Sequence, residues 1–139
     1  MEHSLKRVNQ FNKVFLNICK EIASLSRCNR AKVGAVIVKD KKIISFGYNG
    51  TPDGYCNECE DENNITKKEV LHAESNAILK AKTNLKDSVL YLTLSPCVEC
   101  CKLIKQAGIK KVFFIEAYRD MSGLHLFKID FEQITLDYE

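Results

Sequence analysis

The sequence lacks any apolar run approaching the roughly 20 residues that a membrane-spanning helix needs, and residues 1–7 lack the long apolar stretch of a secretory signal peptide. It also lacks a strong charge of either sign, because 21 basic residues stand against 18 acidic ones and the formal net charge is only +3. So small a charge does not indicate a nucleic-acid-binding protein, although it leaves room for a local basic pocket. These absences favour a cytoplasmic protein with no membrane partner and with reduced cysteines.

What is present suffices for one domain of ordinary size. The 139 residues are 45% hydrophobic and 28% charged, without an internal repeat or a low-complexity tract. We therefore expect a single domain over residues 1–139 with a well-formed core. Seven cysteines are many for such a chain. Because a reducing compartment disfavours disulfides, closely spaced cysteines are better interpreted as metal ligands.

The pattern of apolar residues predicts the order of helices and strands. Residues 5–25 are predicted to be a helix, whose apolar stripe faces the core and consists of Val8, Phe11, Val14, Phe15, Ile18, Ile22 and Leu25. β-branched runs predict strands over 33–38 and 43–48, joined as a hairpin. Later segments are predicted as helix, strand, helix, strand, short helix and strand, over 72–82, 88–94, 97–107, 111–115, 124–127 and 131–136.

This order of elements predicts the fold class. A strand–helix–strand run over 88–115 implies parallel neighbours, whereas the early hairpin implies antiparallel ones. We therefore expect an α/β fold, with a mixed sheet of about five strands and helices on both of its faces.

Two segments carry the side chains of a metal site: a His-Ala-Glu tripeptide that begins at His72, and a Pro-Cys-x-x-Cys segment that contains Cys97 and Cys100. Zinc prefers four tetrahedral ligands, and a catalytic site leaves one position for water. His72, Cys97 and Cys100 supply the other three. Both cysteines lie at the start of a predicted helix, whose positive end favours their thiolate forms. His72 begins another predicted helix, so two helix N-termini are expected to face one ion.

Glu74 is the predicted catalytic residue. It lies two residues after His72, a spacing that places a carboxylate beside the open position of the metal without making it a ligand. There it can carry a proton to and from a reacting group. The rival interpretation is a structural zinc site held by Cys56, Cys59, Cys97 and Cys100. The gap from 59 to 97 is longer than the usual roughly 15–20 residues, and this site would leave His72 and Glu74 unused.

The combination of His-x-Glu with Pro-Cys-x-x-Cys is the signature of zinc deaminases. The chain resembles the cytidine and deoxycytidylate deaminase superfamily, and within it most the deoxycytidylate (dCMP) deaminase branch. The matching stretches are RAKVGAVIV at 30–38, IISFGYNGTP at 43–52, HAESNA at 72–77 and LTLSPCVECCKLIKQAGIKKV at 92–112. The zinc motif marks the superfamily, whereas GYNGTP together with HAESNA points to dCMP.

This resemblance implies a fold, an activity and an assembly. The fold would be a three-layer α/β/α sandwich, and the reaction would be the zinc-dependent hydrolysis of dCMP to dUMP and ammonia, which supplies the precursor of thymidylate. The family forms homo-oligomers, often hexamers. Many members are activated by dCTP and inhibited by dTTP, and here the GYNGTP loop and the region of Lys32 would be the effector surface.

The resemblance also implies substrate-binding positions, which are Asn49, Ala73, Asn76, Ser95, Tyr118 and Arg119. The two asparagines would help to hold the sugar and phosphate, and the backbone of Ala73 and Ser95 would read the pyrimidine edge. Arg119 would reach the 5′-phosphate, since a guanidinium matches phosphate oxygens. Some family members bind a second, structural zinc. Here its candidate ligands are Cys28, Cys56 and Cys59, with no obvious fourth ligand.

Three other functions are compatible with the zinc motif. The first is deamination of dCTP, or of both dCMP and dCTP, because the sequence alone does not count phosphates. The second is a nucleic-acid deaminase such as a tRNA adenosine deaminase, which would use a basic patch formed by Lys102, Lys105, Lys110 and Lys111. The third is a zinc-stapled binding module without catalysis. Retention of Glu74 argues against it, because a structural zinc does not need that carboxylate.

Overall fold

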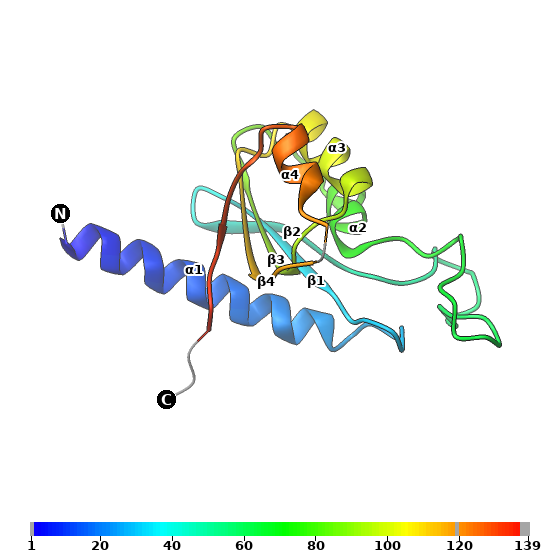
Figure 1. Ribbon diagram of the computed structural model, residues 1–139. Helices are drawn as coiled ribbons and strands as arrows, with labels where there is room; N and C mark the ends of the chain where they lie inside the picture. Colours follow the sequence, from blue (N-terminus) through cyan, green and yellow to red (C-terminus); the bar gives the residue numbers. More distant parts are fainter. Residues whose placement is uncertain (1, 119, 137–139) are drawn as a thin grey trace.

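One mixed sheet organises the computed structural model, which describes residues 2–118 and 120–136 (Figure 1). Its strands are β1 (Gly34–Lys39), β2 (Lys42–Tyr48), β3 (Val89–Leu94), β4 (Lys111–Glu116) and β5 (Asp130–Gln133). They lie in the order β2-β1-β3-β4-β5. β1 pairs antiparallel with β2 and β3, whereas β3–β4 and β4–β5 are parallel. The predicted hairpin, the predicted parallel pair and the five-stranded mixed sheet are all confirmed.

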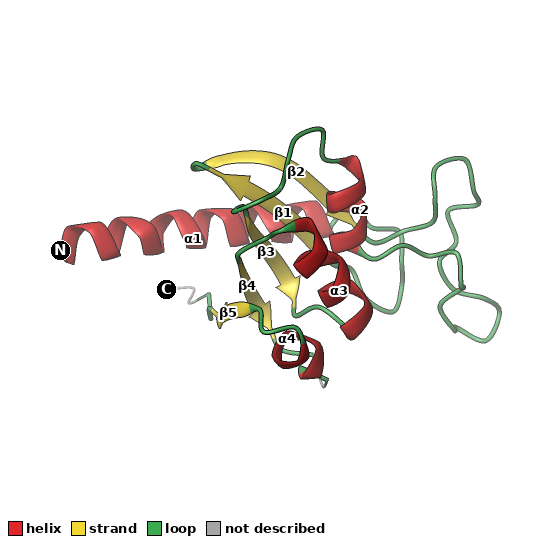
Figure 2. Ribbon diagram, turned by 90° about the horizontal axis from the view of Figure 1, so that it is seen from above, coloured by secondary structure: helices red, strands yellow, loops and turns green. Residues whose placement is uncertain are grey.

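Helices cover both faces of this sheet, which gives the expected α/β/α layers (Figures 1 and 2). The helices are α1 (Glu2–Ala23), α2 (Ala73–Lys80), α3 (Val98–Ala107) and α4 (Ser122–Leu126). α1 packs on one face, mainly against β1 and β3, while α2, α3 and α4 lie on the other. Among the described residues, no helix is both long enough and apolar enough to cross a bilayer.

The face that α1 buries differs in part from the predicted stripe. Leu16 and Cys19, which the prediction omitted, are fully buried against the sheet. Three members of the predicted stripe are instead exposed: Val8, Val14 and Leu25. Val8 is exposed because the first turns of α1 extend beyond the sheet (Figure 1), and Leu25 lies after the last residue of the helix.

A glycine allows α1 to lie close to β1. A Cβ atom at Gly34 would stand 2.0 Å from the carbonyl oxygen of Cys19. Any larger residue would therefore push the helix away from the strand and disturb this layer of the core. The contact sets the position of the residues that follow α1, which become one wall of the site described below.

On the opposite face, the main core lies between the sheet and the helices α2, α3 and α4. It contains Leu90, Leu92 and Phe114 from the central strands and Ile104 from α3, all fully buried. α3 ends at Gly108, which adopts the left-handed conformation with φ of 85° that favours glycine at a helix C-terminus. This core holds α2 and α3 in fixed positions, so that their N-termini are rigid supports for side chains.

Several elements differ from the predicted boundaries: α1 begins three residues and ends two residues earlier than predicted, and α2 ends two residues earlier. α4 begins two residues earlier than predicted, and β5 ends at Gln133 rather than at 136. The segment between β2 and α2 forms a long loop that projects from the body of the molecule (Figure 2). The turn of residues 59–67 within it is closed by a backbone hydrogen bond from Lys67 N–H to the Cys59 carbonyl, at 2.7 Å.

Candidate metal and catalytic site

The candidate metal ligands lie at the N-termini of two neighbouring helices. His72 is the N-cap residue of α2, and Cys97 is the N-cap residue of α3. Both have extended backbones because the chain leaves a loop or strand and turns into a helix there. Pro96 is fully buried just before Cys97 and makes this turn rigid. Cys100 follows in the first turn of α3, so the sequence spacing brings both cysteine sulfurs to the same helix end, as predicted.

The distances between these side chains fit a zinc ion. His72 Nδ1 lies 3.3 Å from Cys100 Sγ and 3.5 Å from Cys97 Sγ. Two ligands at zinc bond lengths in a tetrahedron stand roughly 3.5 Å apart. Among the described residues, His72, Cys97 and Cys100 are the one group of at least three His, Cys, Asp or Glu side chains close enough to hold a metal ion, with ligand atoms within 4.8 Å of one another. One nitrogen and two sulfurs match the preference of zinc and leave a fourth position open.

The three side chains shift one another's ionisation, and Cys97 is the one that becomes a thiolate most readily. Interaction with Cys100 and then with His72 lowers the pKa of the Cys97 thiol to about 4. The Cys97 side chain in turn raises the pKa of His72 above its ordinary value. Cys97 and burial raise the pKa of the Cys100 thiol, so Cys97 is the first of the two to ionise. The Cys97 thiolate lies at the N-terminus of α3, where the helix dipole stabilises its negative charge.

Glu74 lies beside this cluster in the first turn of α2, and only 4% of it is exposed. Burial raises the pKa of its carboxyl group to about 7, and the nearby His72 opposes this shift. A carboxyl group with a pKa near neutrality can both accept and donate a proton, which is what a general acid–base residue requires. The predicted pairing of Glu74 with the three ligands is therefore present in the geometry.

A cavity of about 560 Å³ opens onto these residues and is lined by His72, Ala73, Glu74, Cys97, Ser95, Leu94, Tyr118, Asn49, Val33, Ala31, Arg30, Cys28, Glu60, Thr66 and Val70. This volume lies within the range of roughly 300–1,000 Å³ that is usual for small-molecule sites. Its walls come from five regions of the chain, which are the N-termini of α2 and α3, the segment after α1, the long loop, and the segment after β4.

Four predicted substrate-binding residues line this cavity, which are Asn49, Ala73, Ser95 and Tyr118. The Ser95 hydroxyl accepts a hydrogen bond from the Tyr118 backbone N–H at 2.6 Å, so it ties the loop before α3 to the loop after β4. The side chain of Asn49 is already engaged. It accepts a hydrogen bond from Val33 N–H at 2.9 Å and donates one to the Ala31 carbonyl at 2.8 Å.

The other two predicted substrate-binding residues are not part of this arrangement. Asn76 donates a hydrogen bond to the Tyr48 carbonyl at 2.9 Å and lines a different hollow, between β2 and α2. Asn76 stands two residues after Glu74, which is about 200° around an α-helix, so its side chain faces the edge strand β2 instead of the cavity. Arg119 lies outside the described residues.

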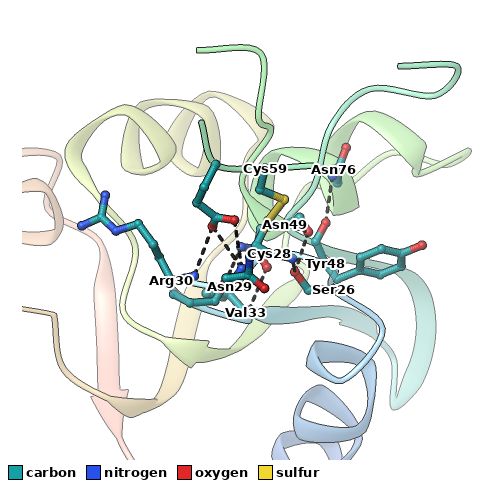
Figure 3. The surroundings of a disulfide bond; sticks show 11 residues. Ser26, Cys28, Asn29, Arg30, Val33, Tyr48, Asn49, Cys59 and Asn76 are labelled. Atoms are coloured by element: carbon teal, nitrogen blue, oxygen red, sulfur yellow. Dashed lines mark hydrogen bonds between the residues drawn. A yellow bond between two sulfur atoms is a disulfide. The ribbon is translucent and has the colours of Figure 1, made fainter. Parts of the chain in front are cut away.

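The predicted second zinc site is not formed by its three candidate cysteines. Cys28 and Cys59 are joined in a disulfide bond, with their Cα atoms 5.1 Å apart (Figure 3). Cys56 is a free, exposed thiol. Sulfur atoms bonded to each other are not thiolate ligands, so this structure corrects both the second-zinc prediction and the expectation of fully reduced cysteines. The sequence did not reveal this pairing because 31 residues separate the two cysteines.

Sequence reasoning also missed two residues of the cavity wall. Glu60 is 9% exposed, and its carboxylate accepts hydrogen bonds from the backbone N–H groups of Asn29 and Arg30. Arg30 lines the cavity on the same side. Neither residue belongs to a spacing pattern, because the contact joins the segment after α1 to the loop before α2.

The arrangement agrees with comparisons to known proteins. The zinc-binding region of the cytidine and deoxycytidylate deaminases matches residues 9–116. The chain belongs to the cytidine and deoxycytidylate deaminase family. Human deoxycytidylate deaminase is 39% identical over 125 residues, which cover 80% of this chain and 68% of the human protein. The deoxycytidylate deaminase of Mycobacterium phage D29 is 35% identical over 119 residues, which cover 75% of this chain and 93% of the phage protein.

The crystal structure of the dCMP deaminase from cyanophage S-TIM5, in complex with dCMP and dUMP, has the same fold. Its TM-score is 0.85 at 36% identity, covering 90% of this chain and 97% of that one. The predicted cytidine deaminase-like architecture is thus confirmed. Family membership identifies the chain as a hydrolytic deaminase with a zinc-binding domain.

Proposed function

We propose that this deaminase converts dCMP to dUMP, with Glu74 as the catalytic residue and with His72, Cys97 and Cys100 as the ligands of one zinc ion. The observation that carries the proposal is the cluster of one imidazole and two thiols beside a buried carboxyl group, at the bottom of a cavity of nucleotide size. The relatives named as deoxycytidylate deaminases and the similarity to a solved dCMP deaminase support this choice of substrate.

The reaction replaces the exocyclic amine of the pyrimidine by an oxygen from water and releases ammonia. A zinc ion held by the three ligands would supply an activated water molecule at its fourth position. The task of the chain is then proton transfer. A Glu74 carboxylate oxygen takes a proton from the water side and delivers it to the ring nitrogen, and the same group assists the departing amine. A pKa near 7 for this carboxyl group suits both directions of transfer.

Recognition of the pyrimidine is assigned to the backbone beside the ligands. Ala73 is the first residue of α2, so its N–H has no acceptor within the helix and is free to donate to a ring carbonyl. The Ser95 N–H already donates to the Glu116 carbonyl at 2.9 Å, which leaves the Ser95 carbonyl as the group that accepts from the exocyclic amine. Both residues line the cavity beside Glu74.

The sugar and phosphate are assigned to the outer part of the cavity. Asn49 and Tyr118 line the cavity, and Arg119 is proposed from the sequence as a phosphate-binding residue. The Asn49 amide oxygen already accepts a hydrogen bond within the fold. Asn49 would therefore contribute to substrate binding through the remaining N–H of its amide group or through the shape that it gives the loop.

The finer features of the family are proposals for this chain. We propose that it forms a homo-oligomer, with a hexamer favoured, and that dCTP activates it while dTTP inhibits it. Three apolar side chains support self-association. Ile43 and Phe46 on the edge strand β2 are 43% and 50% exposed, and Leu79 on the neighbouring α2 is 70% exposed. Light scattering coupled to size-exclusion chromatography measures the oligomer directly.

An ammonia-release assay across deoxycytidine, dCMP, CMP and dCTP tests the proposed function. We expect the highest kcat/KM with dCMP. The same panel in the presence of dCTP or dTTP tests regulation. Preference for dCTP would reassign the substrate within the nucleotide class, and activity only on a tRNA anticodon stem would favour a nucleic-acid deaminase. Zinc-loaded protein without turnover of any of these substrates would contradict the proposal.

A further inference from the structure

Three of the seven cysteines belong to the long loop and to the segment after α1, and the proposed function uses none of them. Cys28 and Cys59 are bonded to each other, and Cys56 lies three residues before Cys59 in the long loop. Cys56 is a free thiol on the surface, whereas Cys28 and Cys59 are only 2% and 1% exposed. One thiol close to one disulfide is the set of groups that a thiol–disulfide exchange requires.

The spacing of Cys56 and Cys59 allows the two sulfurs to meet. They form a Cys-x-x-Cys segment, which is the arrangement found in disulfide-exchanging proteins. Three residues span at most roughly 11 Å between Cα atoms, and a disulfide requires roughly 4.4–6.8 Å, so a tighter turn between the two cysteines suffices. Residues 53–58 are exposed throughout, so this turn can form without the loss of buried contacts.

The two cysteines of this segment are held differently. Cys59 is buried, and its carbonyl accepts a hydrogen bond from Lys67 N–H at 2.7 Å. Cys59 therefore keeps its place, and the exposed Cys56 is the residue that moves towards it. A thiol from solution, by contrast, reaches the buried Cys28–Cys59 bond only when this part of the fold opens.

We infer that Cys28, Cys56 and Cys59 form a thiol–disulfide exchange site whose external substrates are small dithiols. In the internal step, Cys56 loses its proton to water and its thiolate attacks the Cys59 sulfur. The Cys56–Cys59 bond forms, the Cys28–Cys59 bond breaks, and Cys28 leaves as a thiolate that takes a proton from water. One disulfide replaces another, so this step needs no oxidant or reductant. An external dithiol then reduces the Cys56–Cys59 disulfide to two thiols and is itself oxidised to a disulfide.

This exchange would loosen one wall of the catalytic cavity. Cys28 in the segment after α1 and Glu60 in the long loop both line the cavity. The two segments are tied by the disulfide and by hydrogen bonds from Asn29 and Arg30 N–H to the Glu60 carboxylate (Figure 3). Exchange removes the covalent tie and leaves the hydrogen bonds. The consequence for turnover of dCMP rests on the proposed function, whereas the exchange chemistry does not.

The first test measures how fast the native disulfide is reduced. Zinc-loaded wild type, Cys56→Ser and Asn57→Ser are treated with dithiothreitol, quenched with acid and alkylated, and mass spectrometry gives the labelled fraction of Cys28. We expect reduction of Cys56→Ser to be at least about 10-fold slower than that of the wild type, because it then depends on local unfolding. Asn57 is the exposed neighbour of Cys56, so Asn57→Ser is the matched control and should be reduced at the wild-type rate.

The second test asks whether Cys56 and Cys59 can bond to each other. Cys28→Ser leaves Cys59 without its partner, and oxidised glutathione supplies the oxidant. Peptide mapping without reduction should then find a Cys56–Cys59 disulfide. Cys28→Ser combined with Cys56→Ser is the control and should show no internal disulfide at Cys59. The variants of the first test keep the native disulfide, so they test the exchange even if Cys28→Ser does not fold.

The third test concerns the cavity. A dithiothreitol treatment that reduces the wild type and spares Cys56→Ser should speed deuterium exchange of the backbone over residues 27–33 in the wild type alone. With dCMP, we expect the KM of the reduced wild type to rise about 3–10-fold, because the substrate must order a loosened wall. The kcat should stay within about 2-fold, since no group that reacts is removed, and the zinc content should not change.

The outcomes separate this inference from the proposed function. Equal reduction rates for wild type and Cys56→Ser, or folded Cys28→Ser without a Cys56–Cys59 bond, would overturn the exchange site. Unchanged deuterium exchange and KM after reduction would overturn its effect on the cavity. Lack of dCMP turnover by the wild type would remove the proposed function, but the reduction rates, the peptide map and the deuterium exchange need no substrate and would still decide the inference.

Discussion

Two pairs of cysteines each contribute one member, Cys97 and Cys28, to the lining of the same cavity, and the pairs differ in what holds them in place. Cys97 and Cys100 are two residues apart at the start of one helix, and their sulfurs face His72. Cys28 and Cys59 are far apart in the sequence and are bonded to each other between two loops. The first pair is placed by local helix geometry, whereas the second depends on the way in which distant segments pack. One pair is arranged to bind a metal, and the other fastens a wall.

The largest effect is expected when a cysteine of the metal cluster is removed. Cys97→Ser removes one of the three proposed zinc ligands. Mutation of a residue that only supports a ligand typically lowers metal affinity about 10–100-fold, so we expect a larger loss here. We also expect turnover to disappear. Cys56→Ser is the matched control, because Cys56 is a free, exposed cysteine outside the cluster. Elemental analysis of the purified proteins gives the zinc content. Full zinc content in Cys97→Ser would remove Cys97 from the ligand set.

The next prediction concerns Glu74 and separates zinc binding from the chemical step. Glu74→Gln keeps the shape of the side chain but cannot accept the proton, so we expect kcat to fall about 10²–10⁴-fold. The zinc content should stay at one ion per chain, because Glu74 is not a ligand. Single-turnover measurements on the zinc-loaded variant separate the chemical step from product release. Near-normal turnover would exclude Glu74 as the proton carrier.

For the disulfide pair, the expected effect is on stability. Simultaneous Cys28→Ser and Cys59→Ser should lower the free energy of unfolding by about 3–4 kcal/mol, the value expected for a closed loop of this length. The zinc content should not change. Denaturant titration of this variant, with Cys56→Ser as control, gives the comparison. If reducing agent leaves the stability of the wild type unchanged and a second zinc ion appears in the purified protein, the assignment of this pair to a disulfide is wrong.

The smallest effect concerns the ionisation of Glu74 in the zinc-free protein. Its carboxyl pKa is 4.5 in the unfolded chain and about 7 in the fold, because burial disfavours the charge. Between these pH values the folded state holds the proton that the unfolded state has lost. Stability therefore falls as pH rises from about 4.5 to about 7, by about 3 kcal/mol in total.

Glu74→Gln does not ionise and should escape this loss. After zinc removal, we expect it to be more stable than the wild type at pH 7.5 and equally stable near pH 4. Thermal unfolding of both proteins across this range measures the difference. Glu69→Gln is the control, because Glu69 is exposed and lies just before the helix. A difference between Glu74→Gln and the wild type that does not depend on pH would show that burial of this carboxyl group is not its cause.

Much of the fold was predictable because its signals are local. The β-branched runs of β1 and β2 and the periodic apolar residues of α3 predicted their elements to within one or two residues. The stripe of α1 was less accurate. Val8 has the right periodicity, but the helix turn that carries it extends beyond the sheet and has nothing to pack against. Periodicity predicts which face of a helix is apolar, whereas the length of the neighbouring sheet decides how much of that face is buried.

In the candidate site, too, residues placed by local spacing were predicted, whereas contacts between distant segments were not. His72, Glu74, Cys97 and Cys100 were predicted because each pair is separated by two or three residues and lies at a helix N-terminus. Contacts between segments that are distant in the sequence were not predicted. The hydrogen bond from Asn76 to the Tyr48 carbonyl, which turns this side chain towards the edge strand, is one such contact.

By itself, the sequence determined the order of elements and the mixed sheet, and it predicted the cluster of His72, Cys97 and Cys100 that the structure brings together beside Glu74. These depend on spacing along one helix or strand, which the covalent chain imposes directly. Only the tertiary structure decided which cysteines are bonded to each other, that Glu60 holds the backbone of Arg30, and which residues form the outer wall of the cavity. Such contacts join loops about 30 residues apart, and their pairing is set by how the core places the loop ends rather than by any local pattern.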